Sequence, residues 1–160
     1  MTSGDTYIIF ELAGSAYGIR SADVLHVEML EHITSVPNTA AAVEGVVFCR
    51  GQVYPALNLR VRFGLARAAP TPKTRLIFTR ALGRTIALIV DSAREFRSIP
   101  ANAIRPIEQT LHGIHGNYVQ GVTTLGDRLV LLLDVPAVLN LDDPAPLAAA
   151  EASAIQAAAN

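Results

Sequence analysis

A segment of this chain occurs twice, and this repeat limits the possible folds more than any other feature of the sequence. Residues 43–59 align without a gap on residues 119–135, 76 positions further on. A second pair, residues 7–19 and 76–88, aligns 69 positions apart. Each of the four segments is typical of two strands joined by a glycine-containing turn. The sequence therefore predicts two copies of one small β-unit.

Length, composition and charge exclude several classes of protein. The chain has 160 residues, 51% hydrophobic and 17% charged, which is enough to bury the core of one domain or two small lobes. Its formal net charge is −1, without the concentrated basic face that nucleic-acid binding requires. The single cysteine, Cys49, cannot form an intrachain disulfide and is typical of a reducing compartment. The N-terminus lacks signal-peptide features and the apolar runs have strand length, so we expect a cytoplasmic protein without direct membrane insertion.

Short strands dominate the predicted secondary structure. Strands are expected on both sides of the turn in each of the four repeated segments. Two polar residues at equivalent positions of the repeat, Asn58 and Asp134, are each expected to cap a short helix. Ser21 is expected to cap a helical turn before an extended stretch at residues 25–30.

The chain is predicted to be one mainly β domain, residues 1–160, built from two tandem lobes. The proline-containing stretch 68–73 is expected to divide a lobe at residues 7–67 from a lobe at residues 74–141. About five strands in each lobe are expected to close into a small barrel, which removes exposed sheet edges. The alanine-rich end predicts a C-terminal α-helix over about residues 146–158.

The usual signatures of an enzyme or a metal centre are missing. No nucleophile elbow, phosphate-binding loop, zinc-protease motif or C-x-x-C pair occurs. His112 and His115 could supply half of a zinc site, but no cysteine or nearby carboxylate completes it. Cys49 aligns with Leu125, which favours a packing role, and Asp91 ends an apolar strand without a base partner. We therefore expect no catalytic residue, metal or cofactor. A small metal-binding or hydrolytic β-barrel that uses His112, His115 and Asp91 remains as the remote alternative.

Arg50 stands at a hairpin tip where the turn itself does not require arginine. Such tips favour glycine, asparagine or aspartate, and the second copy has Gly126 and Asp127 where the first has Arg50 and Gly51. The charge is therefore surplus to folding and a candidate for recognition of a partner. A solvated surface arginine is the competing interpretation, and the sequence alone leaves both open.

Val24 and Val27 raise a similar question. They lie three residues apart where a helical turn is expected to pass into a strand. Core packing is the better interpretation, because apolar side chains most often lie in the core. A groove between the lobes or an outward patch is the alternative.

At these residues the chain resembles the CheW family, the coupling proteins of bacterial chemosensory arrays. The likeness extends from about residue 7 to residue 141. It is carried by YIIFELAGSAYGI, ADVLHVE, ITSVP, VEGVVFCRGQVYPALNLRVRFGL, IALIVDSAREF and YVQGVTTLGDRLVLLLDV. The G-V-x-x-x-R-G-x-V-x-P pattern over residues 45–55 and the later L-G-D-R-L-V pattern are specific in combination. The resemblance implies two SH3-like five-stranded barrels packed around a shared apolar seam, with a C-terminal helix.

The resemblance also implies a function without catalysis or a cofactor. Members of the family link the cytoplasmic tip of chemoreceptors to a histidine kinase of the CheA type, whose regulatory domain has the same fold. The positions that match the receptor-binding cleft between the lobes are Ile8, Val24, Val27, Ala93 and Arg94. The positions expected near the kinase contact on the first lobe are Val36, Pro37, Arg50 and Gly51.

Departures from the family pattern fall near those sites. Some members carry a carboxylate at the position of His26, where it can pair with the hairpin arginine. Here that pair is absent, Glu28 or Glu31 are the candidates to replace it, and His26 is a candidate for a pH-sensitive contact. Phe48 and Cys49 replace the usual Asn-Leu pair before the arginine. These departures keep open a divergent paralogue that binds receptors without the kinase.

Overall fold

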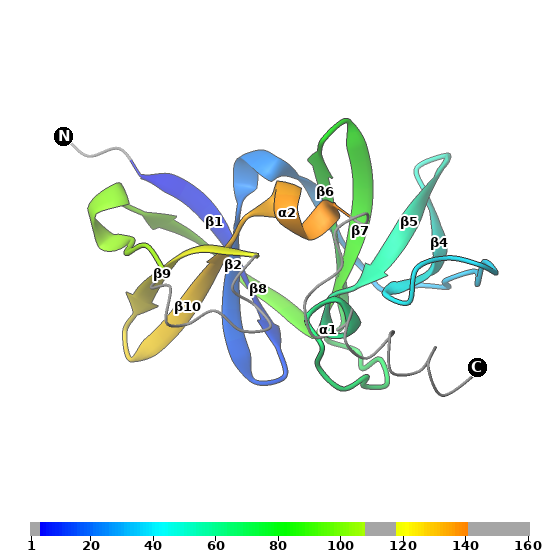
Figure 1. Cartoon of the computed structure of the whole chain (residues 1–160), viewed down its shortest axis with the longest axis horizontal. Coiled ribbons are helices and arrows are strands. Elements are labelled where there is room, and N and C mark those ends of the chain that lie inside the picture. The colour runs from blue at the N-terminus through cyan, green and yellow to red at the C-terminus, as the bar shows by residue number, and fades with distance from the viewer. Residues whose placement is uncertain (1–3, 108–117, 141–160) are drawn as a thin grey trace, which may run out of the picture.

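The computed structural model describes residues 4–107 and 118–140, which form two five-stranded sheets (Figure 1). The first sheet, in the order β8-β1-β2-β10-β9, contains β1 (Asp5–Leu12), β2 (Ser15–Arg20), β8 (Ser92–Ile99), β9 (Val119–Leu125) and β10 (Arg128–Leu133). The second sheet, in the order β3-β6-β7-β5-β4, contains β3 (Val24–Met29), β4 (Val43–Cys49), β5 (Gln52–Asn58), β6 (Arg75–Ala81) and β7 (Arg84–Val90). Four short helical segments complete these ranges: η1 (Ser21–Asp23), α1 (Leu59–Arg62), η2 (Ala101–Ala103) and α2 (Val135–Leu139). The mainly β class and the five strands per unit are confirmed, whereas the C-terminal helix predicted at 146–158 lies outside the described residues.

Sheet membership does not follow the expected tandem lobes at residues 7–67 and 74–141. The hairpin β1–β2 pairs with β8 and β10, and the hairpin β6–β7 pairs with β3 and β5. The chain passes from the first sheet to the second through η1 and returns at Asp91, between β7 and β8. Each sheet therefore combines the first hairpin of one copy with three strands of the other copy. The apolar pattern defines each hairpin but not its neighbour in the sheet, which is why the tandem arrangement was predicted.

The sequence repeat extends to the irregularities of the strands. A register shift leaves Leu25 unpaired between β3 and β6, and an equivalent shift leaves Arg94 unpaired between β8 and β1, 69 positions later. Similar shifts at Glu44 in β4 and at Gln120 in β9 lie 76 positions apart. An unpaired bulge residue locally changes the direction of its side chain and the twist of its strand. The two sheets therefore present the same bulges at the same places.

The identical glycines of the repeat, Gly45 and Gly121, allow a second chain segment to approach the sheet. Thr34 forms an isolated bridge beside Gly45, and Arg105 forms the matching bridge beside Gly121. A Cβ atom on Gly45 would lie 2.0 Å from the carbonyl oxygen of Thr34, and one on Gly121 would lie 3.0 Å from that of Arg105. A side chain at Gly45 would displace the Thr34 backbone, and one at Gly121 would press on the Ile104 side chain, 2.8 Å away, and on the Arg105 carbonyl. The close approach of the second segment therefore favours glycine at both positions.

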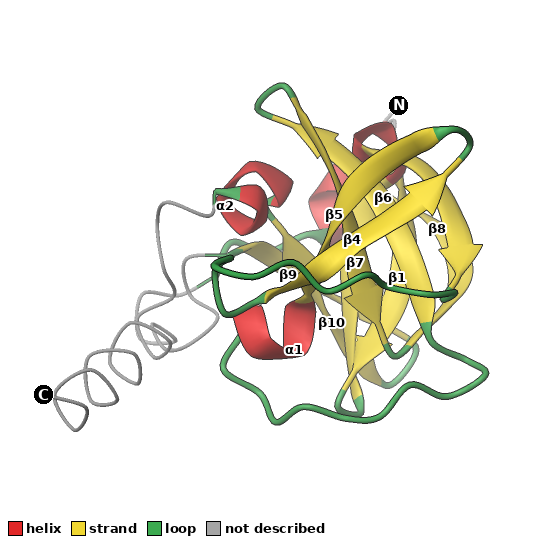
Figure 2. Ribbon diagram, turned by 90° about the vertical axis from the view of Figure 1, so that its right-hand side faces the viewer, coloured by secondary structure: helices red, strands yellow, loops and turns green. Residues whose placement is uncertain are grey.

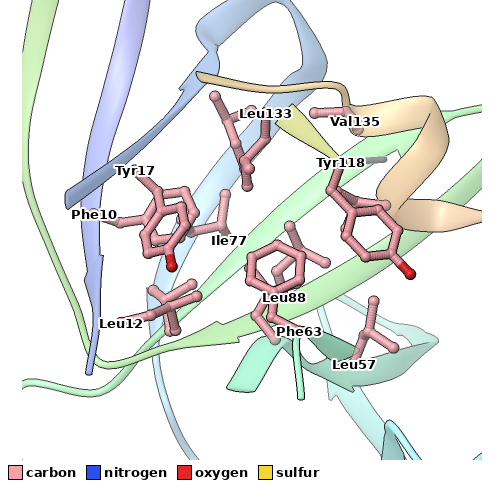
Figure 3. Close-up of a cluster of buried hydrophobic side chains, with 14 of the residues drawn as sticks. Phe10, Leu12, Tyr17, Leu57, Phe63, Ile77, Leu88, Tyr118, Leu133 and Val135 are labelled. Carbon is pink, nitrogen blue, oxygen red and sulfur yellow. The ribbon is translucent and has the colours of Figure 1, made fainter. Parts of the chain in front are cut away.

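The largest apolar cluster lies between the two sheets and takes side chains from both of them (Figure 3). A row of aromatic rings crosses it. Phe10 stacks on Tyr17 at 5.6 Å between ring centroids, Tyr17 contacts Phe63 at 5.7 Å, and Phe63 stacks on Tyr118 at 5.2 Å. Such pairs contribute about 0.5–1.5 kcal/mol each beyond the area they bury. The shared apolar seam implied by the resemblance is confirmed.

The two short helices that follow β5 and β10 are capped as the sequence predicts, and Figure 2 shows both on the same side of the strands. The Asn58 side chain accepts hydrogen bonds from the backbone N–H groups of Arg60 and Val61, and Asp134 accepts one from Ala137. The predicted cap at Ser21 is wrong, because η1 begins at Ser21 itself after Arg20 and has no side-chain cap. Caps of this kind are local in the sequence, which explains the two successes.

Candidate partner-binding sites

Four of the five residues predicted for receptor binding contact the seam between the sheets. Ile8, on β1, is only 3% exposed and belongs to the apolar cluster itself. Val24 and Val27 on β3 and Ala93 on β8 are half-buried and pack against the same cluster. Arg94, the bulge residue of β8, is exposed. The structure thus brings the predicted set to one seam, with Ile8 inside it and Arg94 at the surface.

Exposed apolar side chains on β3 and β8 were missed by the sequence analysis. Leu25 and Met29 on β3 are 51% and 62% exposed, and Phe96 on β8 is 68% exposed. Both strands are edges of their sheets, where exposed apolar side chains mark surfaces suited to a partner. Leu25 was missed because it is the bulge residue of β3. A bulge interrupts the regular alternation of buried and exposed side chains along a strand, and the sequence does not show where a bulge lies.

The four residues predicted near the kinase contact lie along β4, but not together. Arg50 and Gly51 form the exposed tip of the β4–β5 hairpin, with φ angles of 51° and 80°. Val36 and Pro37 are exposed in the loop that precedes β4. The antiparallel bridge of Thr34 to β4 places this loop beside the beginning of the strand, whereas Arg50 follows its end. The residues predicted near the kinase contact therefore occupy two separate parts of the same sheet margin.

A pair of exposed apolar residues lies between these two features. Phe48 on β4 and Val53 on β5 face each other across the hairpin and are 73% and 60% exposed. Phe48 departs from the family pattern in the sequence. Its exposure could not be predicted, because the alternation of side chains along a strand does not show which face is buried until the strand is placed in the sheet. The pair extends the candidate surface from the charged tip along the hairpin.

A polar cluster joins β3 to the hairpin tip. Arg50 donates to the Oε1 atom of Glu28 at 3.2 Å, so Glu28 is the carboxylate that pairs with the hairpin arginine. His26 Nε2 lies 3.8 Å from the same oxygen and 3.6 Å from Cys49 Sγ, and its ring stacks on Phe78 at 4.3 Å. Burial lowers the pKa of His26, the Arg50 charge lowers it further, and Glu28 opposes them. Together these effects favour the neutral form of the imidazole.

The Asp91 carboxylate, named in the hydrolytic alternative, is occupied by a structural contact. It accepts from Arg60 Nε at 2.9 Å, from Arg60 Nη2 at 2.5 Å and from the Ala13 backbone N–H at 2.8 Å. The hydrogen bond from Arg60 is the main cause that holds the pKa of Asp91 below its usual range. Ala13 lies in the β1–β2 turn and Arg60 follows β5, so the carboxylate ties the two sheets together. His112 and His115, the other residues of that alternative, lie outside the described residues.

Comparisons with known proteins agree with this architecture. Residues 6–143 match the family described as CheW-like domain. The chemotaxis protein CheW of Klebsiella aerogenes is 28% identical, covering 90% of this chain and 87% of that protein. The protein of the same name from Helicobacter pylori is 30% identical, covering 85% of this chain and 82% of that protein. The scaffolding protein CheW of Thermoanaerobacter tengcongensis superposes with a TM-score of 0.80 and 27% identity, covering 90% of this chain and 98% of that one.

Within residues 4–107 and 118–140, no helix is both long and apolar enough to cross a membrane. The family match spans most of the sequence and the structural match spans both sheets. Members of this family are non-enzymatic scaffold proteins of chemotaxis. The chain therefore belongs to the CheW family.

Proposed function

We propose that this chain is a cytoplasmic adaptor that couples chemoreceptors to a histidine kinase of the CheA type. The observation that carries the proposal is the ion pair of 3.2 Å between Glu28, on β3, and Arg50, at the hairpin tip. It links the strand that carries Val24 and Val27 to the hairpin that carries Arg50. One body with two partner surfaces raises the effective concentration of each partner for the other, and no chemistry is required.

The receptor tip is proposed to lie along the seam at β3 and β8. The half-buried Val24, Val27 and Ala93, with the exposed Leu25 and Phe96, provide an apolar floor for a helical hairpin. Such a helix binds through residues spaced along one of its faces. The matching bulges at Leu25 in β3 and at Arg94 in β8 give the floor an approximate twofold symmetry. A receptor hairpin of two antiparallel helices has the same kind of symmetry.

The kinase is proposed to bind the margin formed by the loop at Val36 and Pro37 and by the β4–β5 hairpin. Phe48 and Val53 supply apolar area, and Arg50 supplies a charge close to it. Aromatic and arginine side chains near the centre of an interface make the largest contributions per residue to the binding free energy. The two surfaces share the second sheet, so a partner on one can bias the other.

Capture of the chain from a lysate of its own cells, followed by mass spectrometry, tests the proposal. We expect a CheA-type kinase and chemoreceptors together with the wild-type chain. Recovery of receptors without a kinase would instead support the divergent paralogue. Recovery of neither partner would show that the fold has been kept without the coupling function.

A further inference from the structure

Three different metal-ligating side chains converge where β3 meets the end of β4. The ligand atoms of His26, Glu28 and Cys49 all lie within 4.8 Å of one another. Cys49 Sγ is 3.6 Å from His26 Nε2, and Glu28 Oε1 is 3.8 Å from the same nitrogen. All three side chains are partly accessible, and Glu28 and Cys49 line a hollow of about 260 Å³. The cluster is therefore open to an ion from solvent.

The spacing of these atoms matches the edges of a zinc coordination tetrahedron. With typical bonds of about 2.3 Å to sulfur and about 2.1 Å to nitrogen or oxygen, tetrahedral zinc holds sulfur and nitrogen about 3.6 Å apart and nitrogen and oxygen about 3.4 Å apart. The observed distances are 3.6 Å and 3.8 Å. The third pair, Cys49 Sγ and the Glu28 carboxylate, lies within 4.8 Å, so the Glu28 side chain, which is 36% exposed, would move to complete the tetrahedron.

We propose that His26, Glu28 and Cys49 bind a zinc ion. A thiolate, an imidazole and a carboxylate are the donor types that zinc takes, and thiolate disfavours magnesium and calcium. On binding, the Cys49 thiol loses its proton to solvent and its sulfur forms the bond to the metal. The stacked Phe78 ring holds the imidazole in place, and water can take the fourth position that three protein ligands leave open.

The cluster is a property of this chain that no spaced motif in the sequence reveals. His26 and Cys49 are both departures from the family pattern, and they lie 23 residues apart in the sequence. The fold brings the two departures into contact. His112 and His115 are close in sequence and so stand out as a possible metal pair, whereas His26, Glu28 and Cys49 come together only through strand packing.

Zinc at this site would compete with Arg50 for the carboxylate. The Oε1 atom of Glu28 accepts a hydrogen bond from Arg50, so coordination of that oxygen to zinc releases the arginine. In a consequence that rests on the proposed function, metal occupancy then alters the hairpin tip offered to the kinase. The zinc site itself does not depend on the identity of the partner.

Cobalt substitution of the untagged chain tests the site directly. We expect one Co²⁺ per chain, ligand-field bands in the visible region and a thiolate-to-cobalt charge-transfer band, all abolished when Zn²⁺ displaces the cobalt. Because Cys49 is the single cysteine, a thiolate band reports that residue alone. A spectrum without a thiolate band would overturn the proposal. So would a band that disappears on dilution to the monomer, because two chains would then share the ion.

Single substitutions locate the ligands. Cys49→Ser and His26→Gln should each weaken zinc binding by at least roughly a hundredfold in calorimetry, since even outer-shell changes cost about 10–100-fold. His112→Gln and His115→Gln are matched controls that should bind zinc like the wild type. Circular dichroism of each metal-free variant shows whether it folds, and Glu28→Gln provides a third ligand test. Unchanged affinity in folded Cys49→Ser or His26→Gln, or lost affinity in the controls, would refute the site. Zinc binding without recovery of receptors and kinase would refute the proposed function alone.

Discussion

Arg50 is a residue for which we propose a role in partner binding and expect little effect on folding. Its side chain is 67% exposed and pairs with Glu28, and exposed ion pairs contribute about 0–1 kcal/mol. We predict that Arg50→Ala changes the free energy of unfolding by less than about 1 kcal/mol but reduces capture of the kinase. Thermal unfolding and quantitative capture check both parts, with the exposed Arg80→Ala as control. Loss of secondary structure in Arg50→Ala would contradict the interpretation of the tip.

The pair of Arg60 and Asp91 makes stability depend on pH at the scale of single residues. The pKa of Asp91 is lowered in the folded state, chiefly by the hydrogen bond from Arg60. The ionised Asp91 therefore contributes fully to the stability of the fold above the pKa that it has in the unfolded chain, near 3.9. This contribution is lost as the pH falls through the lower pKa that it has in the folded state. We predict that Asp91→Asn costs about 1–3 kcal/mol at pH 7 and that this difference shrinks at low pH.

Urea unfolding of wild type and Asp91→Asn at pH 7 and at pH 3 measures this difference. Asp5→Asn is the matched control, because Asp5 is 63% exposed and pairs with Arg20 at the surface. Its cost should be small at both values of pH. If Asp91→Asn lowers the free energy of unfolding by the same amount at both pH values, the carboxylate does not stabilise the fold through its charge.

At the scale of elements, the hairpin turns contain backbone strain that a substitution can relieve. Leu82 has a φ of 56° before Gly83 in the β6–β7 turn, and its side chain is 62% exposed. Such a turn favours asparagine followed by glycine. We predict that Leu82→Asn raises the free energy of unfolding by about 1 kcal/mol, because leucine is disfavoured in the left-handed region. Chemical denaturation checks this.

The control for Leu82→Asn is Leu129→Asn. Leu129 is 57% exposed but lies in β10, with ordinary strand geometry. Asparagine is unfavourable in a strand, so the control should not gain stability. A gain in both variants would assign the effect to removal of exposed apolar surface instead of to the turn.

The edge strand β3 carries one residue that packs against the core and one that we propose binds a partner. Val27 packs against the seam, so Val27→Asp places a charge beside the apolar cluster and should cost about 3 kcal/mol. Leu25 is the exposed bulge residue, so Leu25→Asp should keep the Tm and lower receptor capture. An unchanged Tm for Val27→Asp would show that Val27 belongs to the binding surface alone.

The sequence predicts local features of the elements better than contacts between them. Asn58 and Asp134 were identified as caps because a cap and its helix are neighbours in the chain. The pairing of Glu28 with Arg50 was one of two candidates, since strand spacing alone did not choose between Glu28 and Glu31. The approach of His26 to Cys49 could not be predicted, because it depends on how β3 and β4 meet in three dimensions.

At the scale of the whole molecule, the interleaved sheets make each half of the sequence depend on the other. The strands β1 and β2 pair with β8 and β10, which come from the second half. We predict that residues 1–69 alone do not fold, because β1 and β2 would lack both neighbours in the sheet. Residues 70–160 should also fail, since β6 and β7 lack β3 and β5.

Co-expression of the two fragments should restore a folded complex, because the break falls in the exposed segment between α1 and β6. Circular dichroism and amide NMR spectra of each fragment, and of the mixture, are the measurement. The uncut chain is the control. Cooperative unfolding of residues 1–69 alone would contradict the interleaved arrangement and would restore the tandem lobes.

The proposed adaptor function belongs to the scale of the whole molecule, and co-sedimentation tests it most directly. Purified CheA-type kinase from the same organism is mixed with receptor-containing membranes, with or without this chain, and the kinase in the membrane pellet is measured. The adaptor account predicts that the kinase sediments with the membranes when the chain is present, and much less when it is absent or replaced by Arg50→Ala. Equal sedimentation of the kinase with and without the chain would contradict the account.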